Sequence, residues 1–130
     1  MFKVMAFLRR RPDLSREKFI DYYETHHAPL ILQLMPGIRD YRRNYLLRSD
    51  LILGNAASPP DFDVVTEIYF DDRAAYEAGM RAFDDPAVMQ RLVTDEENFL
   101  DRERTSFIAV EERASPPDTN FAGGEAQSKK

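Results

Sequence analysis

The sequence of 130 residues contains no cysteine. This absence excludes disulfides, thiolate zinc sites, iron–sulfur clusters and cysteine nucleophiles. The chain also lacks an apolar run of about 18 residues, the length that a membrane-spanning helix needs, so we expect no membrane partner. Basic residues are outnumbered, with 18 Lys and Arg against 23 Asp and Glu, giving a formal net charge of −5. A nucleic-acid partner is therefore not expected, because phosphate contacts need a basic face.

Cofactor signatures are missing as well. No Gly-rich phosphate loop or dinucleotide fingerprint occurs, so we expect neither a nucleotide nor a nicotinamide cofactor. The only histidines, His26 and His27, are adjacent and diverge by about 100° on a helix, whereas paired metal ligands usually sit three or four residues apart. We therefore expect no metal site. The apolar start is too short for a signal peptide and no basic region precedes it, which favours a cytoplasmic protein.

Residue patterns predict four strands and two helices within one domain. The strands are expected at 2–8, 38–47, 62–70 and 105–112, with one helix from 16 to about 35 and a second over 71–101 that is interrupted at Asp85-Pro86. The order β-α-β-β-α-β is the ferredoxin-like split motif, an α+β fold in which two helices cover one face of a four-stranded antiparallel sheet. The domain should span 1–112. Residues 113–130 are poor in apolar residues and rich in Pro, Gly, Ser and charge, which predicts a disordered tail.

Local signals define the first helix. Ser15 is a good N-cap, and Glu17 in the first turn suits the helix dipole. Pro29 lacks an N–H, so we expect the helix to break or kink near 25–28 and to free backbone carbonyls there. Pro36-Gly37 should end it.

The first strand is apolar on both sides. Val4, Ala6 and Leu8 would face one side of the sheet, with Met5 and Phe7 on the other. An antiparallel sheet with one wet face should instead alternate apolar and polar residues. We therefore expect a homodimer in which a second copy covers the face without helices, the alternative being a monomer with a loosely covered face.

His27 is the histidine predicted to face inward. On a helical wheel it falls between Ile20 and Tyr23, and His26 lies at the edge of this stripe. A buried imidazole is well suited to general acid or base catalysis near neutral pH. The alternative is a structural histidine that is hydrogen-bonded to a carbonyl at the kink.

Other polar side chains are candidates to accompany His27. Tyr23 lies one helical turn from it and could stabilise an oxyanion during catalysis, whereas each tyrosine could instead only fill the core. Candidate substrate contacts are His26, Tyr41, Asn44, Tyr45 and Asp95. Asn44 should point to the opposite sheet face from the two strand tyrosines, so only one of these sets can share a cavity with His27. Asp95, Glu96 and Asp101 could orient an imidazole or act as acids, or could belong to a solvated helical surface.

Several short motifs are shared with a known family. They are a strand followed by "RRPDLSREKF", then Tyr23 with "HAPL" at 27–30, then "PGI" with Tyr41, and more weakly "DEENFLD" at 95–101. In these segments the chain resembles the EthD-like family of dimeric α/β-barrel proteins, and the spacing of "HAPL" and "PG" is the most specific part. The resemblance covers roughly residues 2–112.

The resemblance implies a ferredoxin-like homodimer and a class of reactions. Members of this superfamily include cofactor-independent enzymes that act on aromatic or polyketide-like molecules as cyclases, dehydratases, decarboxylases or anthrone-type oxygenases. The matching histidine, His27, would transfer the proton, and the partner would be a small hydrophobic substrate. Two alternatives stay open: a non-catalytic accessory protein that binds a small hydrophobic molecule, and a haem-binding barrel.

Overall fold

The computed structural model describes residues 1–116, which contain a four-stranded antiparallel sheet. Its strands are β1 (Phe2–Leu8), β2 (Asp40–Tyr45), β3 (Val64–Phe70) and β4 (Ser106–Val110). They lie in the order β2-β3-β1-β4, and every neighbouring pair is antiparallel. This topology confirms the predicted ferredoxin-like α+β fold.

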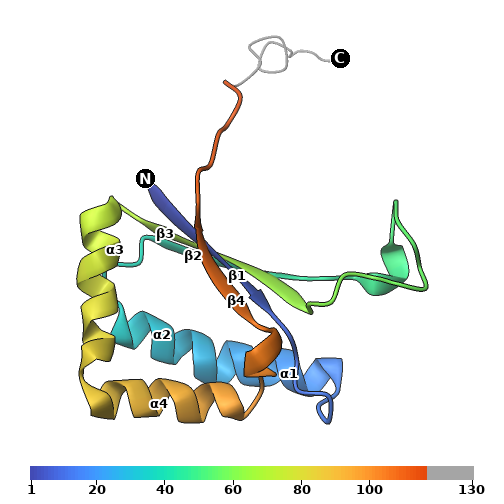
Figure 1. The fold of residues 1–130 in the computed structure, drawn as a ribbon, viewed down its shortest axis with the longest axis horizontal. Helices are drawn as coiled ribbons and strands as arrows, with labels where there is room; N and C mark the ends of the chain where they lie inside the picture. The colour runs from blue at the N-terminus through green and yellow to red at the C-terminus, as the bar shows by residue number, and fades with distance from the viewer. Residues whose placement is uncertain (117–130) are drawn as a thin grey trace.

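The long helices all lie on one face of the sheet (Figure 1). The first consists of α1 (Arg16–Tyr22), the π-helical segment η1 (Tyr23–His27) and α2 (Ala28–Leu34); the second consists of α3 (Arg73–Met80), the 3₁₀ segment η3 (Arg81–Asp84) and α4 (Pro86–Glu97). Two shorter 3₁₀ segments, η2 (Arg48–Asp50) and η4 (Arg102–Arg104), lie in the connections to β3 and β4. The space between the sheet and this helical layer holds the core and the site.

Side-chain caps begin three of the helices. The Ser15 hydroxyl accepts a hydrogen bond from the Lys18 amide at 3.2 Å, which confirms the predicted start of α1. Asp72 caps α3 through the Ala75 amide at 2.8 Å, and Asp85 caps α4 through the Ala87 amide at 2.9 Å. Each cap satisfies an N–H that has no partner inside its helix.

The expected break at Pro29 is replaced by a π-helical turn. The chain stays helical from α1 into α2, and the Ala28 amide donates to the Tyr23 carbonyl five residues earlier. Pro29 has no N–H to donate, and a π turn directly before it changes the hydrogen-bond register without ending the helix. Of the predicted break or kink near 25–28, a break is absent, and the helix is irregular there in the form of the π turn. The turn leaves Tyr23 and His27 buried on the inner side.

The two faces of the sheet differ in what covers them. The face toward the helices is formed by buried side chains of β1 and β3, namely Val4, Ala6, Leu8, Val64, Thr66, Ile68 and Phe70. On the opposite face, Met5 and Phe7 of β1 are half-buried. Lys3 is buried on that face because its ammonium group donates to Glu67 at 2.7 Å and to Glu112 at 2.8 Å. The face without helices therefore combines apolar side chains with an ion cluster.

Two further predictions concern the C-terminal tail and membrane-spanning helices. Most of the predicted disordered tail, residues 117–130, lies outside the described residues. Within residues 1–116, each helix is too short or too polar to cross a lipid bilayer.

Candidate functional site

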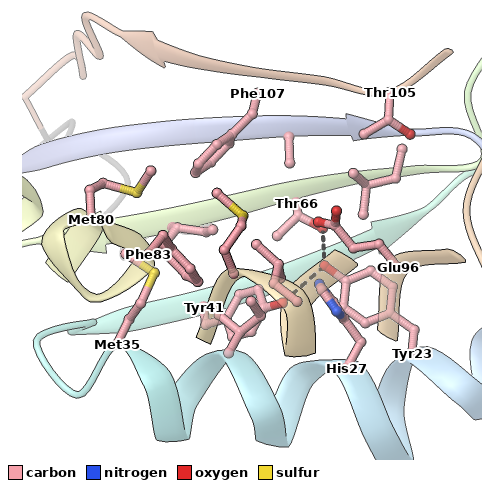
Figure 2. A pocket seen from close by; sticks show the side chains of 16 residues that line it. Tyr23, His27, Met35, Tyr41, Thr66, Met80, Phe83, Glu96, Thr105 and Phe107 are labelled. Carbon is pink, nitrogen blue, oxygen red and sulfur yellow. Dashed lines mark hydrogen bonds between the residues drawn. The ribbon is translucent and has the colours of Figure 1, made fainter. Parts of the chain in front are cut away.

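A cavity of about 160 Å³ lies between the sheet and the helices (Figure 2). Most of its wall is apolar, including Ile31, Met35, Met80, Phe83, Leu92 and Phe107. The polar side chains that reach it are Tyr23, His27, Tyr41, Thr66, Glu96 and Thr105. An apolar cavity of about 150 Å³ holds a molecule the size of benzene. The cavity, which is partly open to the surface beside Phe107, therefore has room for a single aromatic ring.

His27 lines this cavity from the end of η1, where it is only 5% exposed. Its Nδ1 lies 2.5 Å from Asp95 Oδ2. A carboxylate can only accept, so Nδ1 is the donor and the neutral ring carries its lone pair on Nε2. No hydrogen bond within residues 1–116 engages Nε2. The arrangement presents a free basic nitrogen beside the cavity.

Asp95 also accepts a hydrogen bond from a residue other than His27. It lies in α4 and is 8% exposed, and its other oxygen, Oδ1, accepts a hydrogen bond from the Tyr22 hydroxyl at 2.9 Å. Asn98 Nδ2 donates to the same Tyr22 oxygen at 3.0 Å. Burial raises the pKa of Tyr22, so its hydroxyl stays protonated and able to donate. A buried carboxylate needs such donors, because an unpaired charge in the interior is costly.

Three hydroxyl groups form a second polar cluster in the cavity wall. The Tyr23 oxygen lies 2.7 Å from Thr66 Oγ1 and 3.1 Å from the Tyr41 oxygen (dashed lines in Figure 2). Burial raises the pKa of Tyr23 to about 12, and burial also raises the pKa of Tyr41 well above its ordinary value. All three groups are therefore neutral at physiological pH. Three protons serve two internal hydrogen bonds, which leaves one proton for an acceptor in the cavity.

An ion pair between Arg43 and Glu24 packs against the ring of Tyr41. Arg43 donates to both oxygens of Glu24, at 2.9 and 2.6 Å, and its guanidinium carbon lies 4.9 Å from the centre of the Tyr41 ring. Tyr45 also donates to Glu24, at 2.5 Å. The hydrogen bonds from Arg43 hold the pKa of Glu24 below its ordinary value. This pairing fixes the position of Tyr41 through a cation–π contact.

The sequence profile of the EthD domain matches residues 11–103. The chain belongs to the EthD domain family. Comparison with curated proteins finds no match.

Solved structures show the same fold as this EthD-domain protein. An EthD family protein from Bacillus halodurans C-125 has 23% identity and a TM-score of 0.60, with 87% of this chain and 100% of that chain covered. An EthD-like protein from Ralstonia eutropha JMP134 has 15% identity and a TM-score of 0.56, covering 84% and 86%. SnoaB from Streptomyces nogalater, described as a cofactor-independent oxygenase, has 14% identity and a TM-score of 0.50, covering 90% and 96%.

The structure of this EthD-domain protein brings some of the predicted site residues together. Tyr23, His27 and Tyr41 line the cavity, and Asp95 lies directly behind His27. Tyr45 lies in the next layer, bonded to Glu24. The sequence left open whether the acidic run at 95–101 orients an imidazole or forms a solvated surface, and in the structure Asp95 of this run is hydrogen-bonded to His27.

Two other predicted residues lie away from the cavity. His26 is exposed, with its ring stacked on Tyr22 at a centroid distance of 4.6 Å. Asn44 lies on the sheet face without helices, where it donates to the Val65 carbonyl and to Glu67. Strand alternation explains the position of Asn44, as the sequence predicted. A molecule inside the cavity would contact neither residue, so the structure gives no support to them as substrate contacts.

Thr66 was not among the residues singled out from the sequence, and Glu96 was named there without being placed at the cavity. Thr66 is buried and bonded to Tyr23, and its signal was a hydroxyl residue at an inward position of an otherwise apolar alternation in β3. Glu96, which the sequence offered with Asp95 and Asp101 as a possible acid or partner of an imidazole, lines the cavity and accepts a hydrogen bond from Arg102 at 3.0 Å. Within the described residues, no three His, Asp or Glu side chains gather closely enough to hold a metal ion.

Proposed function

We propose that this EthD-domain protein is a small cofactor-independent enzyme in which His27 removes a proton from a hydrophobic, aromatic substrate. The observation that carries the proposal is the buried His27–Asp95 hydrogen bond, which leaves Nε2 free beside an apolar cavity. The description of SnoaB as a cofactor-independent oxygenase supports a reaction of this kind on the same fold. General acid or base catalysis by a positioned histidine contributes a rate factor on the order of 10² to 10⁴.

The first step is a proton transfer within the cavity. An O–H bond of a phenol, or a C–H bond next to a carbonyl, breaks, and its proton moves to His27 Nε2. The imidazolium that forms is stabilised by Asp95, whose carboxylate accepts from Nδ1 at 2.5 Å. The electron pair stays on the substrate as a phenolate or enolate. Its oxygen can accept the unused proton of the Tyr23, Tyr41 and Thr66 hydroxyl cluster.

Later steps decide the reaction subclass. The anion could close a ring, lose water or react with oxygen directly, which correspond to a cyclase, a dehydratase and an anthrone-type oxygenase. In a decarboxylase, the C–C bond to a carboxylate would break instead, CO₂ would leave, and the resulting carbanion would take a proton from protonated His27. The cavity size favours a substrate that places one ring inside, with any larger part extending past Phe107, which is 47% exposed on β4.

Deuterium exchange tests the proton transfer before the natural substrate is known. Hydroxyacetophenones carry one aromatic ring and a methyl group whose protons exchange slowly in water. In D₂O, the natural protein is expected to accelerate the loss of the methyl signal in the ¹H NMR spectrum. The variant His27→Gln, which keeps the size of the side chain but not its basic nitrogen, should lower the protein-dependent rate by on the order of 10² to 10⁴-fold.

The same assay separates the enzyme from a binding protein. A non-catalytic accessory protein would bind the aromatic ketones, seen as chemical-shift changes of cavity residues, without accelerating exchange. Equal exchange rates for the natural protein and a folded His27→Gln variant would also contradict the proposal.

We also propose that the enzyme is a homodimer, with a second copy covering the face of the sheet that has no helices. Met5 and Ile108 lie opposite each other on that face, and Ile108 is 56% exposed. Phe7 adds a third large apolar side chain next to them. An identical face in a C2 pair would bury these side chains together.

Light scattering after gel filtration checks the dimer. The natural protein should have twice the mass of one chain, and Ile108→Arg should shift it to the monomer, because each chain would bury an arginine in the apolar interface. Leu32→Arg, an equally drastic change at an exposed position on α2, should leave the dimer intact. A monomeric natural protein would rule the interface out.

A further inference from the structure

A chain of hydrogen bonds runs from the cavity to the opposite surface of the helical layer. It begins at His27, passes through both oxygens of Asp95 and continues to the Tyr22 hydroxyl and Asn98. Tyr22, Asp95 and Asn98 also line a surface groove, together with Leu30, Gln90 and Thr94. Asp95 therefore lies between the cavity and this groove, with His27 on one side and Tyr22 on the other.

The Tyr22 hydroxyl is fixed in the direction of Asp95. Asn98 donates to its oxygen, so the single proton of the phenol is left to point at Asp95 Oδ1, 2.9 Å away. The ring is held between two others, with centroids 4.6 Å from His26 and 5.1 Å from Phe99. A phenol held in this way donates to one acceptor only, and that acceptor is the carboxylate that orients His27.

We propose that Tyr22 is a positioning residue that sets the proton affinity of His27 through Asp95. The proposal rests on the proposed function, in which His27 is the base. A hydrogen bond donated to a carboxylate draws off part of its negative charge and stabilises the ionised form. With the Tyr22 bond in place, Asp95 attracts the imidazolium less strongly. The Tyr22 hydrogen bond therefore makes the His27 imidazole a weaker base than the same His27–Asp95 pair would be without it.

Other titratable groups near His27 are few. Tyr23 from η1, Tyr41 from β2 and Glu96 from α4 line the same cavity, and Glu96 is paired with Arg102. His26, the next residue in the chain, is exposed and bonded to Thr25 at 2.8 Å. Of all these groups, only Asp95 contacts His27 through a hydrogen bond among the described residues.

The variant Tyr22→Phe tests the proposal, because it removes the hydroxyl and keeps the ring between His26 and Phe99. The readout is an NMR titration of the two labelled imidazoles. Losing the donor makes Asp95 a stronger partner for the imidazolium, so the His27 midpoint should rise by about 0.5 to 1 pH unit, a three- to tenfold change in proton affinity. The exposed His26 keeps its stacking ring, and its midpoint should stay in place.

Two further variants provide a control and a second test of the proposal. Tyr76→Phe removes a hydroxyl from α3, on a ring that packs against Phe2 and Phe70, and should leave the His27 midpoint unchanged. Asn98→Ala, a surface change, should weaken the Tyr22 donor and raise the His27 midpoint by a smaller amount, which keeps the proposal testable if Tyr22→Phe does not fold. If the titration midpoint of His27 is unchanged in a folded Tyr22→Phe variant, the proposal is overturned.

The titration also separates this inference from the proposed function. The acid limb of the deuterium-exchange profile should move upward in Tyr22→Phe by the same amount as the His27 midpoint. A shifted midpoint together with full exchange activity in His27→Gln would refute the base role of His27 and leave the Tyr22–Asp95–His27 coupling standing.

Discussion

Asp95→Asn is expected to lower protein-catalysed deuterium exchange by on the order of 10² to 10⁴-fold, close to the loss in His27→Gln. Asn98 holds Tyr22 as a donor, so the oxygen of the new amide would face Tyr22 and its NH₂ group would face His27 Nδ1. The imidazole would then keep its proton on Nε2, the atom that must be free to act as a base.

The ¹⁵N shifts of the His27 ring report this change of tautomer directly. Glu97→Gln is the matched control, because it removes one charge from an exposed position two residues further along α4. Exchange in that variant should equal that of the natural protein. An Asp95→Asn protein with full exchange activity would show that the carboxylate has no part in the reaction.

Phe99→Ala is expected to cost about 3 to 5 kcal/mol of the free energy of unfolding. Phe99 is 0% exposed, and its ring centroid lies 4.8 Å from His27, 5.5 Å from Tyr23 and 5.6 Å from Phe19. Removing it leaves a void beneath the site residues, and domains of this size are stabilised by only about 5 to 15 kcal/mol in total. Urea unfolding followed by circular dichroism measures the loss.

Phe107→Ala provides the comparison for a large aromatic side chain at the rim of the cavity. Because Phe107 is 47% exposed, its removal should cost about 1 kcal/mol or less. Equal losses for the two variants would contradict the role of Phe99 as the support for the His27 and Tyr23 rings.

Local signals explain why so much of the fold was predictable. Ser15 marks the start of α1, and the Asp85-Pro86 pair marks the interruption of the second helix, through contacts within three residues of the chain. Strand alternation places Asn44 on the opposite sheet face from Tyr41 and Tyr45. The inward position of His27 follows from its spacing from Phe19 and Tyr23. Patterns of this kind depend only on near neighbours, so one sequence contains them.

The features of the fold and site that the sequence did not predict depend on residues far apart in the chain or on unusual helix geometry. His27 and Asp95 are 68 residues apart, and Tyr22 and Asn98 are 76 apart, so the acidic run at 95–101 could not reveal which carboxylate meets the imidazole. The π turn was missed because a wheel of 100° per residue assumes regular α-helix. His26 was a candidate only through its place beside His27, and its ring stacks on Tyr22 at the surface instead.

Chemical rescue of His27→Ala by free imidazole tests most directly whether His27 is the base. The variant should fold, bind a hydroxyacetophenone and fail to accelerate its deuterium exchange. Added 4-methylimidazole would enter the space left by the side chain, and exchange should rise in proportion to its concentration, above the rate of a sample without protein. A folded His27→Ala protein that exchanges as fast as the natural protein without any added imidazole would contradict the account.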